Sequence, residues 1–305
     1  MRNSAPHIIG KLLILLAIGV TIGCQRKDPA PEEIPLPEFV DSPAVHLLAT
    51  NLLHGASGMA DAMNFSDAVW VHNDHDPQLF LLGYDGTLLK TVTFAGESID
   101  WEDMTSGPGP EDNVNYLYIA ETGDNAEIKK DYFIYRFPEP TEGQERIEHF
   151  DTIHFNYPDG QSFDVETLLL DPKTRDLYLL TKRHFNEANL FRLPYPQNTS
   201  GVTTAEFVRK IPYGLLTSGD ISRDGKEILL KNYVSVYYWR LRENETIVSA
   251  LSRPHDLSPT YVVEPQGEAI AFDKYSAGFF TISEKGNSPD PVKLYYYSKK
   301  ANPFY

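Results

Sequence analysis

Short apolar and aromatic segments separated by polar turns repeat five times along this 305-residue chain. Each repeat contains an inward-facing segment, a polar hairpin turn, an apolar segment that ends in polar residues, and an aromatic segment. The segments have the length and the flanking Gly, Pro, Asn and Asp residues of β-strands. The clearest copies span residues 163–196, 217–242 and 266–299, and looser copies span 57–86 and 99–140. The pattern therefore predicts an all-β protein.

The spacing of the repeats indicates a β-propeller, because the copies begin at intervals of roughly 40 to 65 residues, as blades do. We expect five blades of mostly four-stranded antiparallel sheets. A sixth blade within 141–163 or 243–265 is the alternative. Outer strands are expected within 147–158, 205–214 and 246–264.

The last repeat has no outer strand after its aromatic segment. An extended stretch at 44–52, before the first repeat, is expected to supply it. Pairing of the two ends of the domain would remove an exposed sheet edge. We therefore expect the propeller to span residues 44–305 and to be closed by an N-terminal strand.

The beginning of the chain has the pattern of an export signal. Arg2 and Lys11 precede an apolar run, 12–23, that is too short to span a bilayer and ends at the sole cysteine, Cys24. Residues 21–24, TIGC, resemble the bacterial lipoprotein box, so we expect 1–23 to be a lipoprotein signal peptide. Cys24 would then carry the lipid. The alternative is a free cysteine after an ordinary signal or anchor.

Residues 24–43 are rich in proline and acidic residues, which predicts a semi-extended tether. The expected location is the bacterial cell envelope, with the lipid as the sole membrane anchor. Gln25, rather than an aspartate, follows the cysteine, which favours the outer membrane if the source has two membranes.

Charge limits the classes of partner. The chain has 27 Lys and Arg against 43 Asp and Glu, a net charge of −16. Such a surface repels nucleic acid, which excludes nucleic-acid binding as an expected function. It also repels polyanions unless bound cations or a basic pocket reverse the local field.

Aligning the repeats predicts two polar rings at one mouth of the central channel. The innermost segments place Met59, Glu102, Glu166, Asp220 and Glu268 at one position. The ends of the second segments place Asn73-Asp74, Glu121-Thr122, Thr181-Lys182, Lys231-Asn232 and Ser283-Glu284 at another. Gathered carboxylates raise one another's pKa or require a cation.

Calcium is the expected cation, because it accepts six to eight oxygen ligands in flexible geometry. Glu121 and Asp124, in the turn at 121–125, add a second group of oxygen ligands. Two alternatives stay open: Lys182 and Lys231 would neutralise the ring without metal, and the 121–125 turn would be stabilised by its own Asx hydrogen bonds.

Several motifs together resemble the phytase-like, or esterase-like, β-propeller family of exported bacterial proteins. They are DWED (100–103), LYIAETGDN (117–125), IYRFPEP (134–140), DVETLLLDP (164–172) and TKR (181–183), and the resemblance covers most of 57–300. It implies an acidic channel mouth where metal ions and basic side chains bind phosphate. The metal ligands it implies are Glu102, Glu166, Asp220, Glu268, Glu121 and Asp124. Lys182, Arg183 and Lys231 would contact the anion.

Taken together, the sequence predicts an envelope lipoprotein whose propeller binds calcium and a small anionic or phosphorylated ligand, with Asn73 among the ligand-binding residues. If the protein is an enzyme, the expected reaction is phosphoester hydrolysis, with Glu166 as general base and Lys182 as a second catalytic residue. The alternative is a non-catalytic scaffold for protein or glycan partners.

Overall fold

The computed structural model describes Met1 and residues 35–48 and 51–301. The predicted signal peptide, Cys24 and most of the predicted tether lie outside these residues. The chain divides into two units, Met1–Pro35 and Leu36–Tyr305. In the part described, no helix has the length and apolar character needed to cross a membrane.

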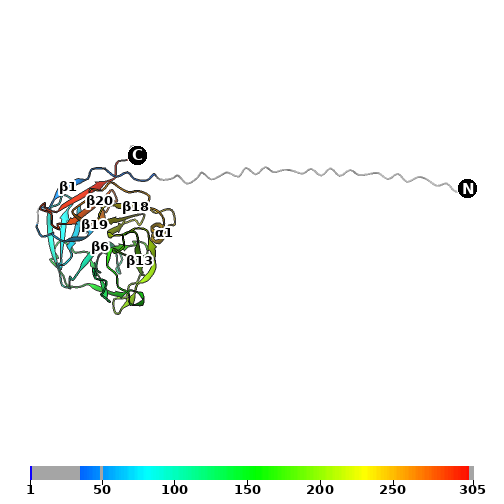
Figure 1. Cartoon of the computed structure of the whole chain (residues 1–305), viewed down its shortest axis with the longest axis horizontal. Helices are drawn as coiled ribbons and strands as arrows, with labels where there is room; N and C mark the ends of the chain where they lie inside the picture. Colours follow the sequence, from blue (N-terminus) through cyan, green and yellow to red (C-terminus); the bar gives the residue numbers. More distant parts are fainter. Residues whose placement is uncertain (2–34, 49–50, 302–305) are drawn as a thin grey trace. The chain divides into compact units, whose positions relative to one another are not determined.

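The unit Leu36–Tyr305 is a five-bladed β-propeller (Figure 1). The innermost strands of neighbouring blades contact each other around the whole ring, in the order β2, β6, β11, β16 and β19. The five-blade prediction is confirmed, and the six-blade alternative is wrong.

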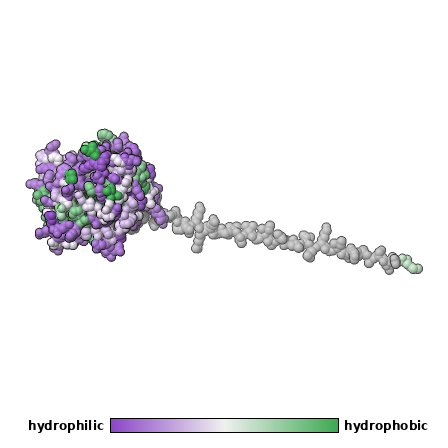
Figure 2. Space-filling model, turned by 90° about the horizontal axis from the view of Figure 1, so that it is seen from below, coloured by the Kyte–Doolittle hydropathy of each residue, from purple (hydrophilic) through white to green (hydrophobic). Residues whose placement is uncertain are grey.

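The face of the propeller in Figure 2 is largely hydrophilic, with scattered hydrophobic side chains.

Each blade is one mostly antiparallel sheet. Blade 1 contains β2 (Ala56–Asp61), β3 (Ala68–Asn73), β4 (Gln78–Gly83), β5 (Leu88–Phe94) and the two-residue β9 (Arg146–Ile147). Blade 2 contains β6 (Trp101–Pro108), β7 (Asn115–Glu121), β8 (Tyr132–Pro138), β10 (Asp151–Asn156) and the two-residue β14 (Thr203–Thr204). A 3₁₀ turn, η1 (Pro158–Gly160), follows β10.

Blade 3 contains β11 (Val165–Leu170), β12 (Leu177–Thr181), β13 (Ala188–Leu193) and β15 (Glu206–Ile211). Blade 4 contains β16 (Leu216–Ile221), β17 (Glu227–Asn232) and β18 (Val236–Arg240).

Blade 5 closes the ring as predicted. It contains β19 (Gln266–Phe272), β20 (Gly278–Glu284), β21 (Lys293–Ser298) and, as its outer strand, β1 (Ala44–Leu47). β1 pairs antiparallel with β21, with Ala44 opposite Tyr296. The two ends of the domain therefore share one sheet, and the edge of β21 is covered.

Blade 4 lacks the predicted fourth strand. The segment after β18 instead forms a short helix, α1 (Ile247–Leu251), whose N-cap Thr246 accepts a hydrogen bond from the backbone N–H of Ser249 at 3.1 Å. The outer strands predicted within 147–158 and 205–214 are confirmed as β10 and β15, whereas the outer strand predicted within 246–264 is wrong.

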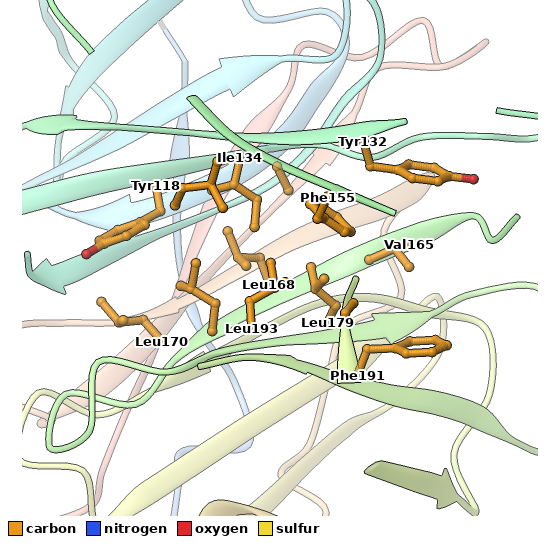
Figure 3. Close-up of a cluster of buried hydrophobic side chains, with 14 of the residues drawn as sticks. Tyr118, Tyr132, Ile134, Phe155, Val165, Leu168, Leu170, Leu179, Phe191 and Leu193 are labelled. Carbon is orange, nitrogen blue, oxygen red and sulfur yellow. The ribbon is translucent and has the colours of Figure 1, made fainter. Parts of the chain in front are cut away.

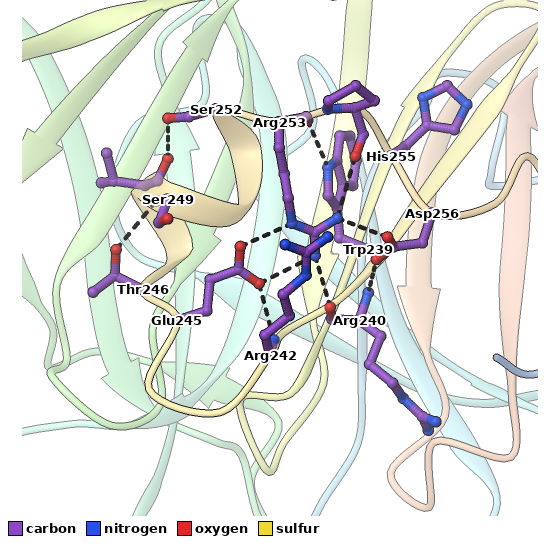
Figure 4. A network of polar contacts seen from close by, with 12 residues as sticks. Trp239, Arg240, Arg242, Glu245, Thr246, Ser249, Ser252, Arg253, His255 and Asp256 are labelled. Carbon is purple, nitrogen blue, oxygen red and sulfur yellow. Dashed lines mark hydrogen bonds and ion pairs between the residues drawn. The ribbon is translucent and has the colours of Figure 1, made fainter. Parts of the chain in front are cut away.

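An ion-pair network fastens this segment to the blade (Figure 4). The guanidinium of Arg253 contacts Glu245 at 2.8 Å and Asp256 at 2.7 Å, and it donates to the carbonyl oxygen of Arg240 at the end of β18. Asp256 accepts from the backbone N–H of Arg240 at 2.8 Å. Beside this network, the backbone of Tyr238 in β18 pairs with Asp256 and Leu257, so this segment takes part of the edge that a fourth strand would otherwise occupy.

The hydrophobic core lies between blades. In Figure 3, Tyr118, Tyr132 and Phe155 of blade 2 face Leu168 and Phe191 of blade 3. Similar clusters fill the other four junctions between adjacent blades. Aromatic side chains of the third strands, among them Tyr132, Tyr238, Trp239 and Tyr297, are buried in these clusters. Blade packing therefore accounts for the aromatic third strands.

Every innermost strand carries a β-bulge near its start. The register shifts between Ala56 and Gly58, Trp101 and Met104, Val165 and Thr167, Leu216 and Ser218, and Gly267 and Ala269. A bulge places an extra residue opposite the partner strand and re-aims its side chain. The bulge residues, one set per blade, are Ser57, Glu102 with Asp103, Glu166, Thr217 and Glu268.

Candidate functional site

A cavity of about 550 Å³ lies at the mouth where the innermost strands begin, and we call it the acidic mouth. All five blades contribute to its lining. The charged residues that line it are Asp74, Asp100, Glu102, Glu166, Glu268, Glu284, Lys182 and Arg183. If all are ionised, these six carboxylates and two cations give a net formal charge of −4.

The bulges decide which inner-strand residues reach this mouth. Glu102, Glu166 and Glu268 are structurally equivalent bulge residues, as predicted, and all three line the cavity. The predicted alignment of Met59 and Asp220 is wrong, because Ser57 and Thr217 occupy the bulge positions in their blades.

Asp220 lies three residues beyond its bulge. It therefore lines a different cavity, at the opposite end of the channel. The structure does not bring Asp220 together with the three glutamates.

The second ring is also shifted by one residue in blade 4. Thr181 pairs with Val165 before the bulge, and Asn232 is the equivalent partner of Leu216. The residue that follows, Lys182 in blade 3, is therefore matched by Tyr233 in blade 4, and both line the acidic mouth.

Lys231, predicted to bind an anion, does not line the acidic mouth. Its buried ammonium donates to the carbonyl oxygens of Gly267 at 2.6 Å and Asn232 at 3.2 Å, and lies 5.0 Å from the ring centroid of Tyr261. Burial lowers the pKa of Lys231 to about 8, despite the nearby carboxylate of Glu264. Lys231 is held within the propeller by protein acceptors.

Three carboxylates meet at the base of the acidic mouth. One oxygen each of Glu102, Asp164 and Glu166 lie within 4.8 Å of one another, and the residues are 8%, 0% and 2% exposed. We call them the acidic triad. Sequence reasoning missed Asp164, which immediately precedes β11. A D-x-E pattern shared by 100–102 and 164–166 was the signal available for it.

Two basic side chains partly neutralise the triad. The ammonium of Lys182 contacts Glu166 Oε1 and lies 5.1 Å from the ring centroid of Tyr233. Arg183 Nε lies 2.9 Å from Asp164 Oδ2, as an ion pair without hydrogen-bond alignment. Both cations line the acidic mouth, as the ligand-binding prediction requires, and each is already paired with one triad carboxylate.

Glu102 is the triad member without a partner. Among the residues that the structure describes, its carboxylate forms no hydrogen bond or ion pair. Burial and the neighbouring charges of Glu166 and Asp100 raise the pKa of Glu102 well above its ordinary value. A buried carboxylate without a partner is costly when ionised.

The other glutamates of the acidic mouth also have raised pKa values. Burial raises the pKa of Glu166 well above its ordinary value, although Lys182 opposes the shift. Burial also raises the pKa of Glu268, and it raises that of Glu284 to about 7. Burial thus favours the protonated form of these carboxyl groups, whereas a bound cation would favour the ionised form.

The side chain of Glu121 is held in place by hydrogen bonds from the backbone. It is buried and accepts hydrogen bonds from the backbone N–H groups of Ile99 at 2.8 Å and Asp100 at 2.9 Å. It does not line the acidic mouth.

Asp124 is similarly engaged. It accepts from the backbone N–H groups of Ile128 and Lys129 at 3.0 and 2.8 Å and from the Tyr132 hydroxyl at 2.8 Å. These bonds agree with the alternative in which the 121–125 turn is stabilised by its own hydrogen bonds.

Asn73 is fully buried, and its side chain holds neighbouring loop segments through hydrogen bonds. Its amide donates to the carbonyl oxygen of Leu52 at 2.8 Å and to Asp76 at 2.9 Å, and its side-chain oxygen accepts from the N–H of Gly55 at 3.2 Å. It does not line the acidic mouth; its neighbour Asp74 does.

No model of a known protein family matches the chain, and no curated protein matches it. The phytase-like resemblance therefore stays a prediction from the motifs between residues 100 and 183.

Proposed function

We propose that this protein is a lipid-anchored propeller of the bacterial cell envelope that binds calcium at the acidic triad and holds a small anionic ligand beside it. The observation that carries the metal proposal is the carboxylate of Glu102. It is more than nine-tenths buried, lines the cavity, and has no partner in the described part of the chain.

Charge balance supports a cation at this position. Lys182 and Arg183 compensate Glu166 and Asp164, and Glu102 is left over. Carboxylate oxygens from two adjacent blades suit calcium, which tolerates irregular oxygen geometry. Protonation of Glu102 would relieve the same imbalance, so calcium competes with protons at this site.

The positions of Lys182 and Arg183 support the anionic ligand. Both line the cavity beside the triad. The volume of this cavity, about 550 Å³, suits a small molecule. Calcium bound there would neutralise part of the charge of an anionic ligand. Without calcium, the lining, with its net formal charge of −4, repels such a ligand.

Phosphoester hydrolysis is the reaction that we propose if the ligand is a substrate. Burial raises the pKa of Glu166 well above its ordinary value, so its ionised carboxylate is a stronger base than that of an exposed glutamate. Lys182, in contact with Glu166, would orient that carboxylate and attract the anion. Replacing Lys182 by Glu should abolish turnover in a folded protein; unchanged turnover would exclude this role.

A melting experiment tests calcium binding. The full chain is stripped with chelator and titrated with calcium or magnesium. A saturable rise in melting temperature with calcium, absent with magnesium, is expected. If neither ion changes the melting temperature, the triad is neutralised by protons, Lys182 and Arg183, and the metal proposal fails.

The lipid anchor rests on residues 1–24 and is tested separately. In a bacterial host, the wild-type protein should partition with the membrane fraction, and a Cys24→Ser variant should be released into the soluble exported fraction. Equal partitioning of the two proteins would exclude lipidation of Cys24.

Exposed hydrophobic side chains favour the second candidate function, a non-catalytic scaffold for a protein partner. Ile99, Ile128, Phe185 and Val234 are 59%, 72%, 80% and 63% exposed, and all four lie in loops next to the ends of strands at the acidic mouth. Phe185 lines the cavity itself. The scaffold would be favoured by two results together: metal ions leave the melting temperature unchanged, and a protein partner captured by the wild type is not captured by a Phe185→Ser variant.

A further inference from the structure

A second cavity, of about 510 Å³, lies at the opposite end of the channel, where the innermost strands end. We call it the second mouth. It is lined by the last residues of β11, β16 and β19 and by hairpins of several blades. None of the residues that line the acidic mouth lines it.

Two cations at the second mouth have no carboxylate partner. Arg223 lies in the hairpin between β16 and β17, and Lys274 in the hairpin between β19 and β20. In the described part of the chain, no carboxylate oxygen lies within 4.0 Å of either charged group. Lys274 donates to the carbonyl oxygen of Phe65 at 2.8 Å, and Arg223 contacts the thioether of Met63. A thioether is a weak acceptor, so the five-donor guanidinium keeps most of its hydrogen-bonding capacity.

Part of the lining of the second mouth is apolar. Leu170, Ile221 and Phe272, the last residues of their innermost strands, are nearly fully buried and line the cavity. Val114 and Pro108 extend the apolar lining toward blade 2. A ligand that fits this mouth therefore has an apolar body as well as an anionic group.

The three carboxylates of the second mouth accept hydrogen bonds from the protein, although Asp61 Oδ1 has no partner in the described part of the chain. Asp220 accepts from the backbone N–H groups of Ile221 and Phe272, both at 2.8 Å, and Asp273 accepts from the hydroxyl of Tyr296 at 2.7 Å. Asp61 accepts from the hydroxyl of Tyr84. Burial raises the pKa of Asp61 and of Asp220 to about 7.

These carboxylates disfavour a multiply charged ligand. Three of them border a cavity that has two cations, so each further negative charge on a ligand adds to its repulsion by the lining. The lining therefore disfavours two negative charges more than one, and its apolar part suits an apolar chain.

We propose that the second mouth binds a small monocarboxylate, with its carboxylate between Arg223 and Lys274 and its apolar chain on Leu170, Ile221 and Phe272. Arg223 exchanges the thioether of Met63 for a carboxylate, with which its planar fork forms paired hydrogen bonds. This site needs no metal and is independent of the function proposed for the acidic mouth.

Calorimetric titration of the full chain with hexanoate, in chelator at pH 7, tests the proposal. Saturable binding of hexanoate is expected. Each methylene removed from hexanoate down to propionate should weaken binding by up to about fourfold. Hexylamine, which has the same chain and the opposite charge, should not bind. Absence of hexanoate binding, or equal binding of hexylamine, would overturn the proposal.

Substitutions locate the site. Arg223→Gln and Lys274→Gln should each weaken hexanoate binding at least tenfold while the melting temperature changes little. Lys226→Gln is the matched control, because Lys226 lies in the same hairpin as Arg223, pairs with Asp224 at 3.3 Å, and does not line the cavity. Binding that is unchanged in Arg223→Gln, or lost equally in Lys226→Gln, would contradict the assignment.

Discussion

Asp103 accepts a hydrogen bond of 2.9 Å from the hydroxyl of Ser218, which joins the innermost strand of blade 2 to that of blade 4. Asp103 also accepts from the backbone N–H of Leu168 in blade 3 at 2.9 Å. The hydroxyl oxygen of Ser218 accepts from the N–H of Ile270 in blade 5 at 3.2 Å. One buried carboxylate, supplied by the bulge next to Glu102, thus organises the centre of the ring.

Replacing Asp103 by Ala should lower the free energy of unfolding by about 3 kcal/mol, because several buried donors lose their acceptor. Urea unfolding measures the loss. Glu148→Ala, at an exposed side chain, is the control and should change stability by less than about 0.5 kcal/mol. Equal stability of the Asp103 variant and the control would show that the centre of the ring does not depend on this carboxylate.

The metal-free protein should be less stable at pH 8 than at pH 5.5. The folded-state pKa of Glu284 is raised from 4.5 to about 7, and burial also raises the pKa values of Glu102, Glu166 and Glu268. Between pH 4.5 and 7 the folded protein therefore binds more protons than the unfolded chain, and stability falls as pH rises through this window.

Thermal melts in chelator across pH 5.5 to 8 measure this dependence. Saturating calcium should raise the melting temperature more at pH 8 than at pH 5.5, because it binds the ionised carboxylates. In a Glu284→Gln variant, the decline in chelator should be shallower. Stability that rises with pH in chelator would contradict the pKa shifts on which the charge argument depends.

Thr217 occupies the same bulge position as Glu166, so Thr217→Glu should add a carboxylate to the acidic mouth. In chelator, this variant should melt below the wild type, since the new charge is buried and repelled by Glu166 and Glu268. Calcium should produce a larger rise in its melting temperature than in that of the wild type.

Thr217→Gln controls for the size of the new side chain, which replaces a hydroxyl that donates to the carbonyl oxygen of Gly267 at 3.3 Å. The Gln variant should show no enhanced response to calcium. If the two variants respond to calcium alike, position 217 does not contribute to the charge of the mouth.

The hydrophobic pattern was sufficient to predict the ring, the number of blades and the N-terminal strand that closes blade 5. It failed at 246–251, where apolar residues that suit a strand form a capped helix instead. Short apolar segments do not distinguish strand from helix, because the decision depends on whether the neighbouring edge accepts another strand.

The site was predicted less well. Whether a side chain faces the mouth depends on the strand register, and a shift of one residue is enough to change it. Glu102, Glu166 and Glu268 were placed correctly, whereas Asp220 and Lys231 were assigned to the mouth although neither lines it. A bulge changes the inward face by one residue without altering the alternating pattern. Asp164 was missed because it precedes its strand.

Calorimetric titration of calcium into the metal-free full chain, compared between the wild type and Glu102→Gln at pH 8, tests the central claim most directly. Glu284→Gln is the matched control, because Glu284 lines the same mouth outside the triad. We predict saturable binding to the wild type, a loss of at least tenfold in affinity in Glu102→Gln, and a smaller loss in Glu284→Gln. Equal calcium affinity in the wild type and Glu102→Gln, or no binding to either, would contradict a metal site at the acidic triad.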